Sequence, residues 1–321
     1  MIPEKDVFSF MKFFSSLNEI QPDSGTYLTF GKFDSLHLGH YHLLQNLVAW
    51  ANETDTPTLI LSFRNNPQAF LQKKEEPKPL LPLAIRKQFL ENIGITTYLY
   101  LPFDEQFSQL NATQFVQQIL LDRLKMSGIL FGYNSRFGYQ GKGNFQLLNS
   151  WGQQAGFIAR EFQEYTVGGE AVSSFRIRNC LANGEIELAN RLLGRSYTIY
   201  GTVISGDRLG RTLHFPTANL QTNQFLPKNG VYGVHVVLPN HQCFQGVLNI
   251  GTRPTVSVAP ELRVEVHLLG FQGDLYGQSL EVQIRHHLRS EKKFSSTEEL
   301  TQQIQRDIHQ FQSLRDHFPK I

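Results

Sequence analysis

The sequence predicts an α/β domain with a parallel sheet, followed by an antiparallel β-barrel with a terminal helix. Between residues 26 and 159, apolar runs rich in strand formers alternate with helical patterns, which is typical of right-handed βαβ units. Beyond residue 195, short strand-like runs separated by turn signals replace that alternation, as in small barrels. A chain of 321 residues accommodates both, and we predict domains of residues 1–186 and 187–321.

The composition is that of an ordinary globular protein and excludes several function classes. Hydrophobic residues make up 40% and charged residues 18% of the chain, and a net charge of +2 gives no reason to expect a nucleic-acid partner or an anionic membrane. No apolar run approaches a membrane span, and the N-terminus lacks the order of a signal peptide. Cys180 and Cys243 share no motif, so we expect a cytoplasmic protein with reduced cysteines.

Five strands and three helices are expected in the first half. The strand-like runs are residues 26–30, 57–63, 97–101, 128–131 and 156–159. The helices are predicted from a Leu43, Leu44, Leu47 and Trp50 stripe, from residues 83–92 before Gly94, and from an Asn111 cap followed by Phe115, Ile119, Leu120 and Leu124. The arrangement is Rossmann-like, but it lacks the dinucleotide GxGxxG turn.

The decapeptide GKFDSLHLGH at residues 31–40 connects the first strand to the first helix. In a parallel sheet such a corner lies at the carboxyl ends of the strands, where ligands bind. Gly39 permits close approach of a phosphate, and the helix start offers free N–H groups. His37 and His40 are three residues apart, so both imidazoles can face an anion that gains charge during reaction. The alternatives are two solvated histidines or half of a zinc site, for which no neighbouring ligands complete a set.

Two further loops are expected at the same edge of the sheet. The segment at residues 131–144 contains several glycines with Asn134 and Arg136, and it can form an anion-binding turn or a plain glycine-rich loop. The segment at residues 172–178 begins a helix with Ser173, Ser174 and Arg178. Hydroxyl, N–H and guanidinium groups at a helix start suit phosphate oxygens, although a simple N-cap with surface arginines has the same composition.

The second half predicts an antiparallel barrel and a closing helix. The strand-like runs are residues 197–203, 230–237, 244–250, 264–269 and 280–284. Ser296 and Glu299 have capping-box spacing, and the helix that follows has an apolar face expected to pack on the barrel, made of Leu300, Ile304, Ile308 and Phe311.

The segment GDRLGRTLHFPTANL at residues 206–220 lies between the first two barrel runs. Its glycines, Gly206 and Gly210, allow backbone N–H groups to face phosphates beside Arg211. Thr217 and Asn219 offer neutral oxygens at alternate positions, which suit Mg²⁺ because this ion keeps waters and shares phosphate ligands. By composition alone the segment could be a flexible hairpin loop.

The decapeptide resembles the HxGH signature of nucleotidylyltransferases and, more narrowly, the GxFDGxHxGH form of bacterial FAD synthetases. The two loops are similar to the GxDFxFG and SSTxIR motifs of those enzymes. The resemblance implies His37 and His40 as catalytic residues and an ATP site formed by Gly31, Phe33, Asp34, Gly39, Asn134, Arg136, Ser173, Ser174 and Arg178.

The chain departs from that family at several positions. Ser35 stands where glycine is usual, Asn134 replaces an aspartate and Phe175 replaces a threonine. The FDPHP motif after the second strand is FRNNP here, so that Arg64 and Asn66 replace its aspartate and histidine. The resemblance gives Asn66 a place in flavin binding. These departures leave open a chain in which residues 1–186 are an inactive scaffold.

The second half resembles a flavokinase along nearly its whole length. Residues 206–219 are similar to GxxxGRxxGFPTAN, with His214 for a glycine, residues 249–255 match NIGxRPT, and residues 288–294 match LRxExKF. The resemblance implies phosphate binding by Gly206, Gly210 and Arg211, a magnesium site at Thr217 and Asn219, and flavin contact by Arg289. It also implies that Glu265 takes the proton of the ribityl hydroxyl, which requires a carboxylate within hydrogen-bond reach.

The whole chain is therefore similar to bacterial bifunctional riboflavin kinase/FAD synthetases. That family implies phosphorylation of riboflavin to FMN and adenylylation of FMN to FAD, with ATP as co-substrate and Mg²⁺ as cofactor. The alternatives are a kinase with a degenerate N-terminal domain, and a non-catalytic flavin- or nucleotide-binding regulator. Thr217, Asn219 and Glu265 together favour an enzyme over the regulator. The sequence has no signature of an oligomeric state.

Overall fold

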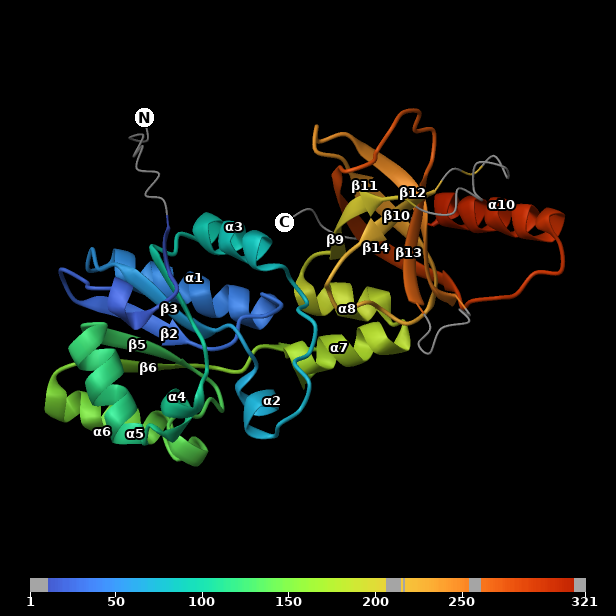
Figure 1. Ribbon diagram of the computed structural model, residues 1–321. Helices are drawn as coiled ribbons and strands as arrows, with labels where there is room; N and C mark the ends of the chain where they lie inside the picture. Colours follow the sequence, from blue (N-terminus) through green and yellow to red (C-terminus); the bar gives the residue numbers. More distant parts are fainter. Residues whose placement is uncertain (1–10, 206–214, 216, 254–260, 315–321) are drawn as a thin grey trace. The chain divides into compact units, whose positions relative to one another are not determined.

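The computed structural model describes residues 11–205, 215, 217–253 and 261–314. The chain forms two compact units, coloured from blue to green and from yellow to red in Figure 1. The first comprises Met1–Pro77 and Leu81–Ala171, and the second comprises Lys78–Leu80 and Val172–Ile321. No helix of the described residues is long and apolar enough to cross a membrane.

The first unit is built on a six-stranded parallel sheet with the strand order β1-β4-β3-β2-β5-β6. The strands are β1 (Lys12–Phe14), β2 (Thr26–Phe30), β3 (Thr58–Phe63), β4 (Thr97–Leu101), β5 (Met126–Gly132) and β6 (Ile158–Phe162). The parallel sheet and its five expected strands are confirmed. The last strand begins at Ile158 because Gly156, with φ 81°, ends the preceding helix, and β1 adds an edge that the sequence analysis missed.

The connections carry the expected helices and several short ones. They are α1 (Leu38–Asn52), α2 (Pro67–Leu71), α3 (Leu83–Ile93), α4 (Glu105–Gln109), α5 (Ala112–Gln114), a π-helix (Phe115–Arg123) and α6 (Phe145–Ala155), with 3₁₀ turns at Leu17–Glu19 and Tyr139–Gly141 and a hairpin of β7 (Thr166–Val167) and β8 (Glu170–Ala171). Asn111 caps α5 in a capping box with Gln114, as its type predicts. The helix then widens, and the Leu124 N–H donates to the Ile119 carbonyl five residues back.

Aromatic side chains pack beneath the carboxyl end of β2 in the first unit. The Phe30 ring, on the last residue of β2, contacts the rings of Phe115, Phe131 and Phe137 edge to face, with centroids 5.3, 5.6 and 6.0 Å apart. Phe137 is nearly fully buried. This packing connects β2 to the glycine-rich loop after β5, so two of the predicted site segments share one support.

The second unit combines two helices, α7 (Ser174–Asn183) and α8 (Ile186–Leu193), with a closed antiparallel barrel. Its strand order is β10-β13-β12-β11-β14-β9, from β9 (Tyr197–Ile204), β10 (Ala218–Gln221), β11 (Gly230–Val237), β12 (Cys243–Arg253), β13 (Glu261–Leu268) and β14 (Ser279–Arg289). The predicted barrel is confirmed. The strand β10 was not expected, because its four residues were read as part of a loop.

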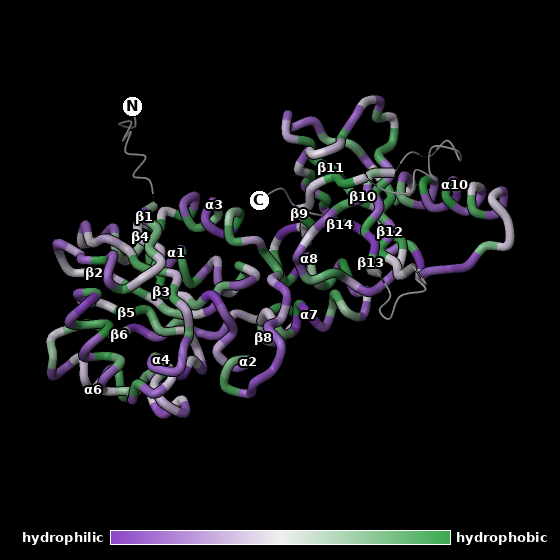
Figure 2. Tube along the Cα trace, in the orientation of Figure 1, coloured by the Kyte–Doolittle hydropathy of each residue, from purple (hydrophilic) through white to green (hydrophobic). Residues whose placement is uncertain are grey.

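The barrel is covered on one side by α10 (Thr297–Ser313), along which hydrophilic and hydrophobic residues alternate (Figure 2). The Phe311 ring packs on Gly233 of β11, where a β-carbon would collide with it. The Ser296 hydroxyl caps the helix, accepting from the Glu299 N–H at 3.2 Å. The reciprocal bond of the predicted capping box is shifted, because the Glu299 carboxylate accepts from the Ser295 N–H at 3.0 Å.

Candidate active sites

The turn at residues 31–37 leads from β2 into α1 through an unusual backbone path. Phe33 and Leu36 have φ angles of 39° and 44°, the left-handed region that non-glycine residues seldom adopt. Asp34 and Ser35, between them, are buried. The Asp34 Oδ1 atom accepts a hydrogen bond from Arg86 Nη2 of α3 at 3.2 Å. The turn therefore has one preferred shape rather than a set of open-loop conformations.

The two histidines of the decapeptide lie together at the start of α1. His37 is the N-cap residue, and its Nδ1 atom accepts from the His40 N–H at 3.2 Å. The two rings are stacked, with centroids 3.7 Å apart and planes at 15°. A β-carbon on Gly39 would stand 3.1 Å from His37 Cε1, so a larger residue at this position would crowd the ring where it folds back over the helix start. The spacing thus places both imidazoles on one side, as expected.

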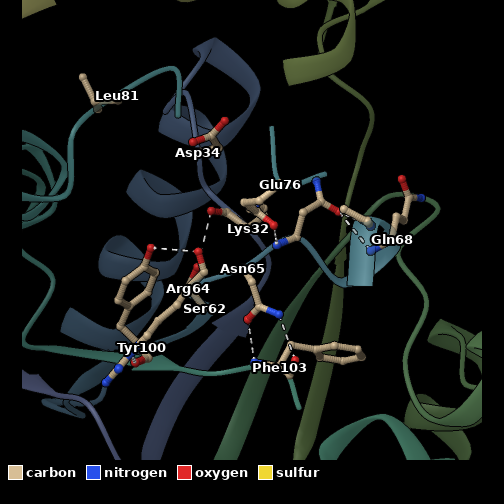
Figure 3. Close-up of polar contacts among 12 residues, drawn as sticks. Lys32, Asp34, Ser62, Arg64, Asn65, Gln68, Glu76, Leu81, Tyr100 and Phe103 are labelled. Carbon is tan, nitrogen blue, oxygen red and sulfur yellow. Dashed lines mark hydrogen bonds and ion pairs between the residues drawn. The ribbon is translucent and has the colours of Figure 1, made fainter. Parts of the chain in front are cut away.

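The loop after β3 is fixed by polar contacts to neighbouring segments (Figure 3). The Glu76 carboxylate accepts from Lys32 Nζ and from the Asn66 N–H, each at 2.7 Å. Asn65 and Phe103 exchange two hydrogen bonds, at 2.8 and 2.9 Å. The Asn66 Oδ1 atom caps α2 by accepting from the Gln68 and Ala69 N–H groups.

Arg64, which stands in place of the motif's aspartate, turns toward the backbone of other segments. Its Nη2 atom donates to the Ser15 carbonyl at 3.0 Å, and its Nε atom donates to the Tyr100 carbonyl at 3.3 Å. Arg64 therefore ties β1 and β4 to the end of β3. Arg64 and Asn66, the two replacements in the FRNNP segment, thus form hydrogen bonds to backbone groups that support the local structure.

The glycine-rich loop after β5 exposes its two predicted phosphate ligands. Asn134 adopts a left-handed φ of 55°, and both Asn134 and Arg136 are exposed. Gly138, at φ 71°, passes so close to Ala112 that a β-carbon would lie 2.6 Å from the Ala112 nitrogen. The close contact with α5, together with buried Phe137, fixes the base of the loop while its polar tip faces solvent.

The SSFRIR segment begins helix α7 in the second unit. The Ser173 hydroxyl caps the helix by accepting from the Arg176 N–H at 3.2 Å, and Ser174 is the first helical residue. The Arg178 guanidinium lies 5.1 Å from the centre of the Phe225 ring. The segment therefore begins with a capped helix, and nucleotide binding by Ser173, Ser174 and Arg178 stays a prediction.

Three predicted residues of the barrel gather on its outer face. Asn219 of β10 is paired with Glu265 of β13, and Glu265 is paired with Asn249 of β12. Their strand neighbours point inward and are buried, namely Ala218, Leu220, Val264, Val266, Leu248 and Ile250. Thr217, directly before β10, is exposed. The outer face therefore carries a row of amide and carboxylate groups, with Arg263 Nη1 4.0 Å from Glu265 Oε1.

The sequence analysis gave no role to two polar residues beside this row. Asn249 belongs to the NIG segment, and Glu291 belongs to the LRSEKKF segment. The Glu291 carboxylate packs on Gly251, where a β-carbon would collide with Oε1, and it accepts from Asn229 Nδ2 at 3.2 Å. The motifs themselves were the available signal, because both residues lie inside matched segments.

Arg289, predicted to contact flavin, forms an ion pair within the barrel unit. Its Nη2 atom lies 2.9 Å from Oδ2 of Asp307 on α10, and its Nε atom lies 3.1 Å from both carboxylate oxygens. The Asp307 side chain is 1% exposed, and the Arg289 side chain is 21% exposed. An aspartate within the apolar stripe of α10 was the sequence signal for such a partner.

Gly206, Gly210 and Arg211 lie outside the described residues, as do the last residues of the NIGTRPT match.

Comparison with known proteins decides the family. The FAD synthetase family model matches residues 19–176, and the riboflavin kinase family model matches residues 193–314. The chain is 37% identical to the bifunctional riboflavin kinase/FMN adenylyltransferase of Haemophilus influenzae over 88% of this chain and 92% of that protein. The chain belongs to the bifunctional riboflavin kinase/FMN adenylyltransferase family.

Two further relatives carry the same name, and one solved structure is similar along nearly the whole chain. The Escherichia coli K12 protein of the same name is 37% identical over 89% of this chain and 91% of its own length. The Pseudomonas fluorescens protein is 36% identical over 93% of this chain and 96% of its own length. A crystal structure of a Streptococcus pneumoniae protein described as a macrolide-efflux protein matches with a TM-score of 0.87 and 25% identity, covering 95% of this chain and all of that one.

Proposed function

We propose that the chain performs both reactions of its family, with riboflavin, FMN and ATP as substrates and residues 187–321 and 1–186 as the kinase and adenylyltransferase domains. The barrel phosphorylates riboflavin to FMN, and the parallel-sheet domain adenylylates FMN to FAD with release of pyrophosphate. The observation that carries the kinase reaction is the register of Asn219 opposite Glu265, beside exposed Thr217, and the stacked histidines at the start of α1 support the adenylyl transfer. We place both reactions in the cytoplasm.

In the kinase reaction, Glu265 acts as the base. Its carboxylate is 30% exposed on the outer face of the barrel, where a ribityl hydroxyl can approach it. As the hydroxyl oxygen attacks the γ-phosphorus of ATP, its proton passes to Glu265 and ADP leaves. Arg263 Nη1 lies 4.0 Å from the carboxylate. Gly206, Gly210 and Arg211 hold the ATP phosphates, and Arg289 borders the flavin.

The residues around this row fit a magnesium ion. Thr217 and Asn219 present neutral oxygens, and Glu265 adds a carboxylate on the strand next to Asn219. Mg²⁺ prefers hard oxygen donors and usually shares its coordination shell with substrate phosphates and water. Thr217 and Asn219 would hold the ion, and when bound it would neutralise charge on the transferred phosphoryl group.

In the adenylyl transfer, a phosphate oxygen of FMN attacks the α-phosphorus of ATP, and pyrophosphate leaves. His37 and His40 stabilise the negative charge that develops on the triphosphate, assisted by N–H groups at the start of α1. Further ATP contacts come from Gly31, Phe33, Asp34, Gly39, Asn134, Arg136, Ser173, Ser174 and Arg178. Asn66 borders the flavin. No covalent intermediate on the protein is required.

A second candidate is a kinase with an inactive first domain. It is favoured by one observation, that Asn66 Oδ1 and the Arg64 guanidinium form hydrogen bonds to the protein backbone. In that case FMN would accumulate, and FAD would not form.

A product assay distinguishes these functions. The purified protein is incubated with riboflavin, ATP and Mg²⁺, and in a parallel reaction with FMN, ATP and Mg²⁺, before flavins are separated by chromatography. We expect FMN and FAD in the first reaction and FAD in the second. FMN without FAD in both would select the kinase-only alternative. The absence of both FMN and FAD would contradict the enzyme function and favour a flavin- or nucleotide-binding regulator.

A further inference from the structure

The turn that carries the histidine pair is anchored by a buried arginine from a different helix. Arg86 lies in the first turn of α3 and is 2% exposed, and Asp34 in the turn is 4% exposed. No residue of the decapeptide motif predicts this arginine. A buried guanidinium seldom occurs without a partner, because removing a charge from water is unfavourable unless the charge is paired.

The guanidinium joins three segments of the first unit. Arg86 Nη2 donates to Asp34 Oδ1 at 3.2 Å and to the Leu81 carbonyl at 3.1 Å. Its Nη1 atom donates to the Tyr98 hydroxyl of β4 at 3.5 Å, and the group lies 5.8 Å from the Tyr100 ring centre. Burial lowers the pKa of Arg86, whereas its contacts with Tyr98, Asp34 and Tyr100 raise it; the net pKa lies above the usual value, so the side chain stays charged.

Asp34 is placed where the turn needs support. It lies directly after Phe33 and two residues before Leu36, the two left-handed residues of the turn. Strained backbone of this kind persists only where surrounding contacts fix it. Three residues after Asp34, His37 caps α1 and accepts from the His40 N–H. A displacement of Asp34 would therefore move both imidazoles and the N–H groups at the helix start.

We propose that Arg86 is a positioning residue for FMN adenylylation, which holds the turn at residues 31–37 through its buried ion pair with Asp34. The inference rests on the proposed role of His37 and His40. Arg86 does not touch ATP. It keeps the strained turn, the stacked imidazoles and the start of α1 assembled before the triphosphate arrives. The Asp34 side chain contributes to the ATP site through this pair, while the backbone of the turn faces the nucleotide.

The test compares Arg86→Met and Arg86→Lys in the full-length protein. FAD formation from FMN is measured as kcat and KM, and riboflavin phosphorylation by the same preparation reports on the barrel. We expect Arg86→Met to lower kcat/KM for FAD formation on the order of 100-fold, since small misplacements of catalytic groups have effects of that size. Arg86→Lys keeps a cation, so its kcat/KM for FAD formation should be at least about tenfold higher than that of Arg86→Met. Kinase activity should be unchanged in both variants.

A matched control uses Arg123, a second arginine of the first unit that donates to a backbone carbonyl, that of Leu17 at 2.7 Å. Arg123 lies just before β5, at the amino-terminal end of the strands, whereas the turn lies at their carboxyl end. Arg123→Met should therefore leave FAD formation within about twofold of wild type. Asp34→Asn and Arg86→Met remove the same interaction. The double variant should therefore lose less activation free energy for FAD formation, calculated from kcat/KM, than the sum of the losses in the two single variants.

Three outcomes would overturn the proposal. The first is full FAD formation by Arg86→Met. The second is an equal loss in Arg86→Lys and Arg86→Met accompanied by an equal fall in melting temperature, which would indicate general destabilisation. The third is additive behaviour of the Asp34 and Arg86 changes. His40→Ala separates these results from a failure of the site assignment: unchanged FAD formation in His40→Ala removes the histidine site itself, and the positioning proposal falls with it.

Discussion

The two candidate sites are assembled in opposite ways. At the corner of the parallel sheet, the two histidines proposed as catalytic residues lie three positions apart at the end of a single turn, and a local hydrogen bond from the His40 N–H to His37 orients them. On the barrel, Asn219, Glu265 and Asn249 meet only because three strands pair in one register. The first site therefore depends on the shape of a loop, and the second depends on the closure of a sheet.

The difference has a consequence for mutation. A site made by one loop tolerates changes elsewhere in the sheet if the supports of the loop remain. A site made by register is more demanding, because a shift of one residue along a strand turns its side chains to the opposite face. The two activities also provide an internal control, since riboflavin phosphorylation reports on the barrel and FAD formation reports on the histidine turn, and either activity shows that the chain is folded.

The largest effect is expected for the barrel base. Glu265→Gln keeps the shape of the side chain but removes the proton acceptor, so riboflavin phosphorylation should fall by about 10²- to 10⁴-fold. FAD formation from supplied FMN should be unchanged. The control Glu281→Gln alters another barrel-strand glutamate and should retain kinase activity. Normal turnover in Glu265→Gln would remove the base assignment.

The second largest effect is expected for the two histidines at the start of α1. The double change His37→Ala and His40→Ala should lower FAD formation by about 10²- to 10³-fold, because it removes the groups that face the developing charge. Riboflavin phosphorylation serves as the control and should persist. The measurement is the rate of FAD release with FMN and ATP supplied. A loss of both activities would mean that the change unfolds the protein and that the two units are not independent.

A stability prediction addresses Arg289. Because Asp307 is almost fully buried, Arg289→Ala leaves its carboxylate without a cationic partner and should lower the free energy of unfolding by about 3 kcal/mol. Denaturant unfolding measures this value. The exposed pair of Lys292 and Glu299, at 3.2 Å, gives a contrast, since Lys292→Ala should cost less than about 1 kcal/mol. If Arg289→Ala raised the KM for riboflavin without loss of stability, flavin contact would be its main role.

The smallest effect is a pH dependence at the start of α10. Hydrogen bonds from the Ser295 N–H and hydroxyl lower the pKa of Glu299 from 4.5 to about 2. A lowered folded-state pKa stabilises the protein above pH 4.5, and that contribution is lost as the pH falls from 4.5 toward 2. Unfolding measured across this range should show a shallower decline for Glu299→Gln than for wild type. Parallel curves would mean that the carboxylate adds nothing to the cap.

The success of sequence reasoning follows the same division. The corner was predicted well because strand, turn and helix are adjacent and have local periodicities, as in β2 and α1. The short strands β1 and β10 were missed, since three or four residues carry too little pattern to distinguish a strand from a loop. The π-helix was expected to be an α-helix because its stripe of apolar residues also fits that period.

Long-range pairs were the other gap. Arg86 and Asp34 belong to segments that no local rule connects, and the same is true of Arg289 and Asp307. Each pair nevertheless left a trace, because Arg86 lies four residues before buried Leu90 and Asp307 lies four residues before Phe311, on otherwise apolar helix faces. A charged residue in such a stripe indicates a buried partner without identifying it. The role of Asn249 required the barrel register.

The closed barrel and the open sheet also differ in how they meet other chains. Each of the six barrel strands has a neighbour on both sides, whereas the parallel sheet ends at β1 and β6. An unpaired strand can recruit an extended segment of another molecule. The chain limits this hazard, because β1 is three residues long and β6 carries Arg160 and Glu161. Aggregation of partly unfolded protein is therefore expected to start at the parallel sheet, since the barrel must open before its strands can pair with another chain.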